Sequence, residues 1–199
     1  MNQVMVGVEG ISDEGAVRAI LREFGLTVKM IQGKNGKDSL LKKLPAYNNA
    51  AVHFPWFVLV DLDSADGCVV EKLSTWLPQP STNMIFRVAV AELEGWLLAD
   101  REAVADFLGV AESKIPRNPD SLSDPKQEII NLARKSRKRD IREGLVPRPR
   151  SGASVGPTYA SDIRDFGQRY WRPRVAAEAS PSLARCLLRV EQLAARLNG

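Results

Sequence analysis

Short apolar runs and stretches of helical periodicity alternate through the first half of the chain. Apolar runs predict strands over residues 4–8, 26–31, 56–60 and 84–90. Apolar side chains that recur every three or four positions predict helices over 12–24, 39–44 and 69–77, with a further helix through 92–97. Ser12 is the expected N-cap of the first helix, and Gly25 is expected to end it. Strands that alternate with helices are typical of an α/β fold with a mostly parallel central sheet.

The second half of the chain has no strand pattern. Helical stretches are predicted over 101–108, 125–135 and 182–197, separated by segments rich in Pro and Arg, most visibly 147–157. We therefore expect two parts, an α/β core over 1–100 and a helical extension over 101–199 that packs on this core.

Length and composition agree with an ordinary globular protein and exclude collagen-like, disordered and disulfide-scaffold classes. The chain has 199 residues, of which 44% are hydrophobic, and its net charge is +4. The two cysteines, Cys68 and Cys186, lie far apart, which leaves little room for a zinc site. The most apolar run, 51–60, is shorter than a membrane helix, and the N-terminus lacks a signal-peptide pattern. We expect a cytoplasmic protein without a membrane partner.

Charge is distributed unevenly between the two halves. Residues 1–99 carry 9 basic and 11 acidic side chains, whereas residues 100–199 carry 19 and 13. The basic excess is largest in the span 134–150. Such a run is either a solvated helix face or a surface that contacts phosphates. The candidates for nucleic-acid contact are Arg134, Arg137, Lys138, Arg139, Arg148 and Arg150.

Acidic residues follow two of the predicted strands. Glu9 follows the first strand, Asp61 and Asp63 follow the third, and Asp13 lies one helical turn beyond Glu9. Because parallel strands end at the same edge of a sheet, these four carboxylates are expected to lie close together. Two like charges about 4 Å apart repel by about 4 kcal/mol at an effective dielectric constant near 20, so the cluster requires protons or cations. Mg²⁺ prefers such oxygen ligands.

Each acid also has a purely structural interpretation. Asp13 can complement the dipole of the helix that it begins, and Asp61 and Asp63 can begin a turn. Acids that directly follow buried apolar strands are nevertheless difficult to explain by folding alone, so we favour a metal site.

These residues resemble the TOPRIM domain of topoisomerases, primases and OLD-type nucleases. The resemblance rests on the segment 8–14 (Val-Glu-Gly-Ile-Ser-Asp-Glu), a helix, and an apolar strand that ends on Asp61-Leu62-Asp63. It implies that Glu9 is a general acid or base and that Asp61 and Asp63 hold Mg²⁺. Asp13 stands where the nuclease branch has a second metal-binding acid, more often glutamate.

A closer resemblance covers most of the chain. The segment 91–100 (Ala-Glu-Leu-Glu-Gly-Trp-Leu-Leu-Ala-Asp), Lys126, Gly156-Pro157 and Ser180-Pro-Ser182 are similar to small stand-alone TOPRIM proteins, which are often encoded beside an ABC- or SMC-type ATPase in phage-defence operons. The resemblance implies that Glu94, with Glu92, completes the acidic site and that Lys126 faces a phosphate. The alternatives are that Glu92 and Glu94 only begin a helix and that Lys126 is an ordinary surface lysine.

The chemistry expected of such a site is hydrolysis of phosphodiester bonds. Two Mg²⁺ or Mn²⁺ ions about 4 Å apart can activate a water and stabilise the leaving oxygen. The basic second half would then hold nucleic acid, with DNA as the expected substrate. Trp171, Arg172 and Arg174 are expected on the surface, as a contact for DNA or for the ATPase.

Other classes fit the sequence less well. A topoisomerase needs a nucleophilic tyrosine, for which Tyr47, Tyr159 and Tyr170 are the candidates, and the length leaves no room for strand-passage domains. A haloacid-dehalogenase phosphatase usually has Thr or Val where this chain has Ala65. The main alternative is a TOPRIM-like subunit that binds nucleic acid or a partner without independent catalysis.

Overall fold

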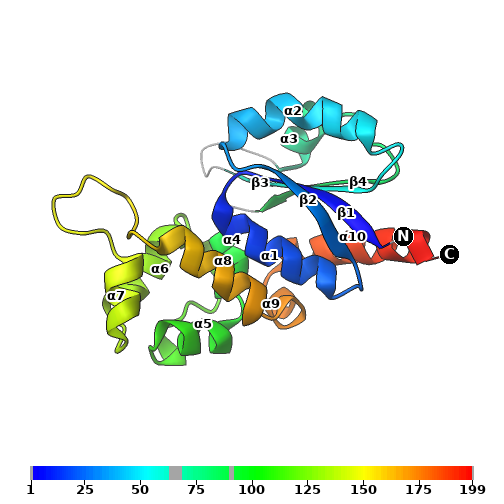
Figure 1. Ribbon diagram of the computed structural model, residues 1–199. Helices are drawn as coiled ribbons and strands as arrows, with labels where there is room; N and C mark the ends of the chain where they lie inside the picture. Colours follow the sequence, from blue (N-terminus) through cyan, green and yellow to red (C-terminus); the bar gives the residue numbers. More distant parts are fainter. Residues whose placement is uncertain (1, 63–68, 90–91, 199) are drawn as a thin grey trace.

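The computed structural model describes residues 2–62, 69–89 and 92–198 (Figure 1). Its strands are β1 (Gln3–Val8), β2 (Thr27–Gly33), β3 (Trp56–Asp61) and β4 (Met84–Ala89). Its helices are α1 (Ile11–Arg22), α2 (Lys37–Ala50), α3 (Val69–Trp76), α4 (Leu93–Leu98), α5 (Arg101–Leu108), α6 (Pro125–Arg134), α7 (Arg139–Leu145), α8 (Tyr159–Arg169), α9 (Pro173–Ala179) and α10 (Pro181–Asn198). Two short 3-10 turns, η1 (Glu112–Lys114) and η2 (Pro119–Ser121), lie between α5 and α6.

The four described strands form a parallel sheet with the order β2-β1-β3-β4 (Figure 1). In the register of the two central strands, Gly7 of β1 lies opposite Val58 of β3. The expected α/β fold with a parallel sheet is therefore confirmed. Since all four strands run in one direction, their carboxyl ends share one edge of the sheet.

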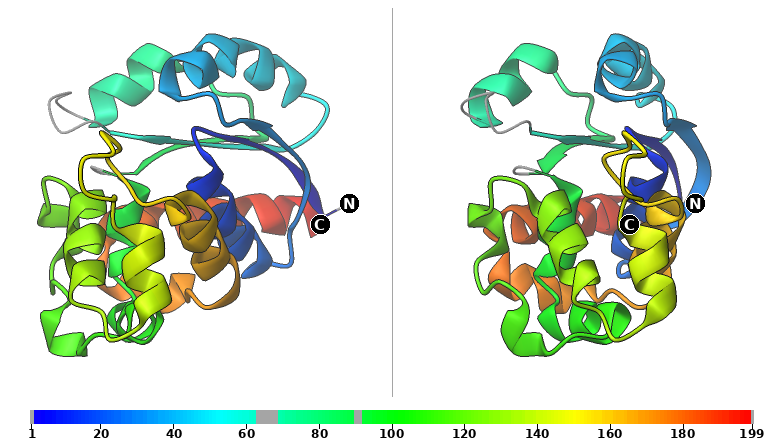
Figure 2. Two further views of the ribbon diagram at one scale, coloured as in Figure 1. Left: turned by 60° about the vertical axis from the view of Figure 1, so that its left-hand side comes forward. Right: turned by 90° about the vertical axis from the view of Figure 1, so that its left-hand side faces the viewer.

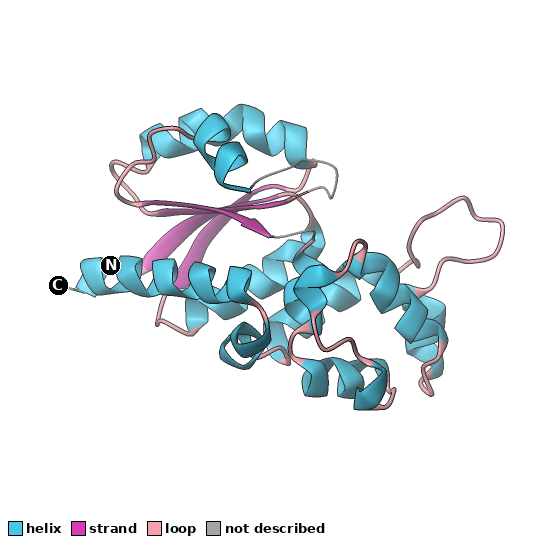
Figure 3. Ribbon diagram, turned by 180° about the vertical axis from the view of Figure 1, so that it is seen from behind, coloured by secondary structure: helices cyan, strands magenta, loops and turns pink. Residues whose placement is uncertain are grey.

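Helices cover both faces of this sheet, with α2 and α3 on one face and α1 and α10 on the other (Figures 1 and 3). Along β3, Trp56 and Val58 belong to the apolar cluster under α2, while Phe57 and Leu59 belong to the cluster under α1. Both faces of the strand are thus buried, which explains why the sequence of β3 is continuously apolar rather than alternating.

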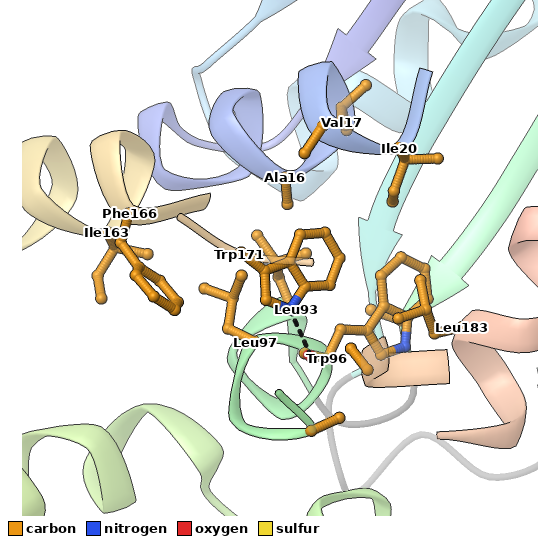
Figure 4. Close-up of a cluster of buried hydrophobic side chains, with 14 of the residues drawn as sticks. Ala16, Val17, Ile20, Leu93, Trp96, Leu97, Ile163, Phe166, Trp171 and Leu183 are labelled. Atoms are coloured by element: carbon orange, nitrogen blue, oxygen red, sulfur yellow. Dashed lines mark hydrogen bonds between the residues drawn. The ribbon is translucent and has the colours of Figure 1, made fainter. Parts of the chain in front are cut away.

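The apolar cluster under α1 continues without a break into the second half of the chain. Helices α4 to α9 gather beside α1 (Figure 2), and Trp96 of α4 packs near the center of this cluster (Figure 4). Its indole N–H donates to Ser182 Oγ at 2.7 Å. Trp171 donates to the carbonyl oxygen of Trp96 at 3.2 Å. One core therefore includes residues from both halves.

The surface role expected of Trp171 is wrong. Its side chain is only 2% exposed, because an indole buries a large apolar area when it packs against α1 and α4. The neighbouring arginines are also engaged: Arg172 pairs with the fully buried Asp100 and with Glu102, and Arg174 pairs with Glu23.

Short polar networks join the helices to each other. Asp100 accepts three hydrogen bonds from Arg172 and one from the Ala103 N–H at the start of α5. The hydroxyls of Ser180 and Ser182 both donate to Asp120. The Ser180-Pro-Ser182 segment thus ties α10 to η2, so its role in this structure is to join helices.

Local structure differs from the sequence-based expectation at two points. Helix α1 begins at Ile11 with Gly10 as its N-cap, two residues earlier than the expected Ser12 cap, and the Asp13 carboxylate accepts the Gly10 N–H there. Helices α7, α8 and α9 lie between the predicted helices, in segments for which the sequence predicted no helix. These segments are rich in charge and proline, and their apolar sides are buried only in the assembled structure.

No helix within the described ranges is long and apolar enough to span a membrane.

Helices α1 and α8 approach each other unusually closely. A Cβ atom added at Gly15 would lie 1.9 Å from the carbonyl oxygen of Arg164, and one added at Gly167 would lie 2.9 Å from the Ala16 nitrogen. Two glycines, one on each helix, therefore permit backbone contact, and this contact fixes the second half of the chain against the sheet.

Replacement of Gly15 by alanine should destabilise the protein, because the added methyl group collides with backbone that cannot move aside. We expect the free energy of unfolding to fall by about 1–3 kcal/mol, measured by urea denaturation. The control is Ala160→Val, which adds volume on an exposed position of α8 and should change stability by less than about 0.5 kcal/mol. Equal effects of the two substitutions would contradict the close packing.

Candidate functional site

Glu9 and Asp61 meet where the two central strands end. The Asp61 backbone N–H donates to Glu9 Oε1 at 2.7 Å, and Asp61 Oδ1 accepts the Leu93 N–H at the start of α4 at 2.9 Å. Because β1 and β3 are parallel neighbours, the residues that follow them lie side by side. Asp61 Oδ2 accepts no hydrogen bond from the described part of the chain. The predicted proximity of Glu9 and Asp61 is therefore confirmed.

Asp13 belongs to the same group and also caps its own helix. Its Oδ2 accepts the Gly10 N–H at 2.8 Å, its Oδ1 accepts the Ser12 hydroxyl at 3.0 Å, and only 6% of the residue is exposed. Burial raises the pKa of Asp13 above its ordinary value, while these hydrogen bonds and the charge of Lys126 lower it in part. The structural interpretation of Asp13 as a helix-start residue is therefore correct, and it does not exclude an electrostatic role.

Like charges surround Asp61. Burial raises the pKa of Asp61 well above its ordinary value, and the charges of Asp13, Glu94 and Glu9 raise it further. Lys126 acts in the opposite direction. The described part of the site therefore concentrates negative charge around one carboxyl group, an arrangement that favours a bound proton or cation.

Lys126 is held between two glutamates rather than free on the surface. Its Nζ lies 2.9 Å from Glu92 Oε1 and 3.8 Å from Glu94 Oε1, and its backbone N–H donates to Glu92 Oε2 at 2.8 Å. Burial by itself would lower the pKa of Lys126, but the charge of Glu94 and the contacts with Glu92 outweigh it and raise the pKa. Lys126 is therefore a partly exposed lysine whose ammonium group is paired with the acidic group. Glu92 is the N-cap residue of α4, so its contacts with Lys126 link the start of α4 to the N-terminus of α6.

Glu94 is the most deeply buried acid of the group, and Tyr159 supports it. Only 2% of Glu94 is exposed, and its Oε1 accepts the Tyr159 hydroxyl at 3.0 Å. Burial raises the pKa of Glu94 to about 7, against the lowering effect of Lys126. Burial and the Glu94 charge likewise raise the pKa of Tyr159. A carboxyl group with this pKa can exchange a proton near neutral pH.

The sequence offered Tyr159 only as a candidate nucleophile. Its position two residues after Pro157, in a segment similar to small TOPRIM proteins, was the one available signal of its place in the site. Because the contact with Glu94 spans 65 residues, no local pattern could reveal it.

The acidic group has the chemistry of a divalent-cation site, but its described part is incomplete. Asp61 Oδ2 and the accumulated negative charge fit a hard cation that prefers oxygen ligands. Asp63 lies outside the described residues. Within the residues that are described, no three acidic, histidine or cysteine side chains are arranged closely enough to hold a metal ion.

The basic residues proposed for nucleic-acid contact have different environments. Arg148 and Arg150 are exposed on the loop 146–158, which projects on the side of the carboxyl ends of the strands (Figures 1 and 2). By contrast, the Lys138 ammonium group donates to the carbonyl oxygens of Asp106 and Phe107 at the end of α5.

The other three arginines lie on α6, on α7 and between them. Arg134 donates to Asn131, and Arg139 pairs with Glu143 four residues later. Arg137 is exposed. Lys138 thus stabilises a helix end, whereas Arg148 and Arg150 remain the best candidates for contact with a phosphate backbone.

Comparison with known proteins adds no assignment: no protein-family model, curated protein or solved structure matches this chain.

Removal of the Tyr159 hydroxyl should destabilise the protein, because the buried Glu94 carboxyl group loses a hydrogen-bond donor. For Tyr159→Phe we expect the free energy of unfolding to fall by about 1–3 kcal/mol, measured by chemical denaturation. Tyr170→Phe is the matched control, since Tyr170 is 62% exposed and its loss should be nearly neutral. An unchanged stability of Tyr159→Phe would show that this hydrogen bond contributes nothing.

Proposed function

We propose that this protein is a metal-dependent nuclease that hydrolyses phosphodiester bonds of nucleic acid at the acidic site. The observation that carries the proposal is the contact between Glu9 and Asp61 at the ends of adjacent parallel strands, with Asp13 and Glu94 close enough to raise the pKa of Asp61. Carboxylates that lie close together repel one another, and a bound proton or divalent cation removes this repulsion. A group of acids with raised pKa values is therefore typical of a functional site.

The proposal gives each residue of the site a role. Asp61 and Asp63 would hold Mg²⁺ or Mn²⁺, with Glu9, Asp13, Glu92 and Glu94 as further acidic groups. When bound, two such ions supply an activated water and stabilise the leaving oxygen. Glu9, which stands beside the Asp61 backbone, would take or deliver the proton. Lys126, which contacts Glu92 and Glu94, would hold these two glutamates in position. As a catalytic residue, it would also contact the phosphate of the substrate.

The substrate and the biological setting are proposed on separate grounds. The exposed Arg148 and Arg150 suit a polyanionic backbone, and we propose DNA as the substrate. An ABC- or SMC-type ATPase partner, a role in phage defence and a cytoplasmic location rest on the resemblance to small TOPRIM proteins alone.

The direct test is cleavage of plasmid, linear duplex, single-stranded DNA and RNA in Mg²⁺, Mn²⁺ or EDTA. We expect metal-dependent cutting that EDTA abolishes. Glu9→Gln should reduce the rate by about 10²–10⁴-fold, because it removes a proton-transfer group. Asp61→Asn should also reduce it strongly. Both substitutions keep an oxygen that can accept the same backbone N–H.

Asp38→Asn is the matched control, because Asp38 is an exposed acid on α2 and its loss should leave the rate unchanged. Cutting that survives both Glu9→Gln and Asp61→Asn would mean that a contaminating nuclease, or another site, is responsible.

DNA affinity tests the basic loop separately from catalysis. For Arg148→Ala/Arg150→Ala we expect weaker binding, and the slope of log K against log salt should become less steep by about 2, since two phosphate contacts are lost. Lys42→Ala/Lys43→Ala removes the same charge from exposed positions of α2 and should have little effect. Identical salt slopes for both double variants would reject the loop as a DNA contact. Fluorescence anisotropy over a salt series provides the measurement.

One observation favours a second candidate function, a nucleic-acid-binding or partner-binding subunit without independent catalysis. Asp13, Glu92 and Glu94 already accept hydrogen bonds from within the protein. Acids used in this way can serve folding alone. Metal binding that Asp61→Asn abolishes, without any cleavage, would support this candidate over the nuclease.

A further inference from the structure

A groove of about 300 Å³ runs along the outer edge of β4, away from the acidic site. It is lined by the strand from Met84 to Arg87, whereas the acidic residues gather at the opposite, carboxyl end of the sheet. One wall comes from α3 and the other from the second half of α10. Figure 3 shows the sheet from behind, between the helices that cover its two faces.

The floor of this groove is an unpaired strand edge. Asn83 and Ala89 direct their carbonyl oxygens toward β3, where Trp56 and Leu62 donate to them. In a parallel ladder, alternate residues direct their backbone groups to opposite sides. The N–H and C=O groups of Phe86, which lines the groove, therefore point outward. Those of Val88, the next outward-facing residue of β4 beyond the groove lining, point the same way. No described strand pairs with this side of β4.

The two walls have different chemistry. On the α3 side, Leu73 and Leu77 stand beside Phe86 of the strand. On the α10 side, Arg189 and Arg196 stand beside Arg87 of the strand. An extended chain laid along β4 presents its side chains alternately to the two walls, because side chains on a strand alternate with a period of two.

Among the described residues, the arginine wall has no acidic counterpart. Arg189 donates to Gln192, and Arg196 donates to the carbonyl oxygen of Thr82. Arg87 Nε is buried and has no hydrogen-bond partner in the described structure. Burial lowers the pKa of Arg87, and the charges of Arg189 and Arg185 add to this effect. Within the described ranges, no carboxylate forms an ion pair with any of these arginines.

We infer that this groove binds an extended segment of a partner protein, which adds to β4 as a fifth strand and alternates acidic with apolar side chains. Its backbone would pair with Phe86 and Val88, its acidic side chains would meet Arg87, Arg189 and Arg196, and its apolar side chains would cover the α3 wall. This inference is independent of the proposed nuclease activity.

Two other occupants fit the groove less well. A second copy of this chain, paired edge to edge by a two-fold axis, would place the same three arginines near their own copies, and the like charges would repel. A nucleic acid would satisfy the arginines, but it would leave the backbone edge unpaired and the apolar wall uncovered.

The test uses the full chain and a fluorescein-labelled decapeptide in which glutamate alternates with valine. We expect saturable binding by fluorescence anisotropy. Arg189→Glu/Arg196→Glu should weaken this binding at least about tenfold, and a peptide with lysine in place of glutamate should regain affinity for that variant. Lys42→Glu/Lys43→Glu changes the net charge equally on exposed positions of α2 and should bind the acidic peptide normally.

Strand addition has a second signature that needs no variant. Amide hydrogen exchange at Phe86 and Val88 should slow at least about tenfold at saturating peptide. N-methylation of the peptide at the residues that face β4 should abolish binding, whereas N-methylation at the alternate residues should not. Unchanged exchange at both amides, or equal binding of the acidic and lysine peptides to the unmodified protein, would overturn the inference. A third result would also overturn it: an oligonucleotide displaces the peptide and does not slow amide exchange at Phe86 or Val88. The groove would then bind polyanions rather than a protein strand.

Discussion

The compensation of buried negative charge connects the two halves of this protein. Four acids, Glu9, Asp13, Asp61 and Glu94, lie near the ends of β1 and β3, and the charges of the other three raise the pKa of Asp61 beyond the effect of burial. The first hundred residues supply the acids. The second half supplies the Lys126 ammonium group between Glu92 and Glu94, and the Tyr159 hydroxyl on Glu94. The helices beyond residue 100 are therefore part of the site, because they provide the positive charge and the donor that its deepest carboxylate needs.

Apolar packing brings these groups into position. Helix α8, which begins at Tyr159, can contact α1 closely because Gly15 and Gly167 have no side chains. Trp96 and Trp171 then fill the space beneath α1, and their indole N–H groups are satisfied by Ser182 and by the Trp96 carbonyl oxygen (Figure 4). A buried indole N–H without a hydrogen-bond acceptor would destabilise the fold. The Ser182 hydroxyl and the Trp96 carbonyl oxygen are therefore needed at these positions, in addition to the apolar packing.

The sheet thus presents two regions of opposite charge to its surroundings. Its carboxyl end carries the acids, and the outer edge of β4 carries Arg87 with Arg189 and Arg196. Edge strands usually have some protection from pairing with other chains. Here the arginines provide it against a second copy, since identical charges would meet, and they leave the edge open to an acidic segment.

The sequence by itself determined the α/β class, the four strands to within about two residues, and the convergence of Glu9 with Asp61. These three conclusions depend on simple rules: apolar runs form buried strands, and parallel strands end at one edge of the sheet. Only the tertiary structure decided the environments of Tyr159, Trp171, Lys126 and Arg87. Each of these side chains owes its environment to residues far away in the chain, or to a sheet edge that no described strand covers. The sequence pattern also did not reveal α7, α8 and α9, because their apolar sides are buried only by elements outside each segment: α6 and α8 for α7, α1 for α8, and α4 and α10 for α9.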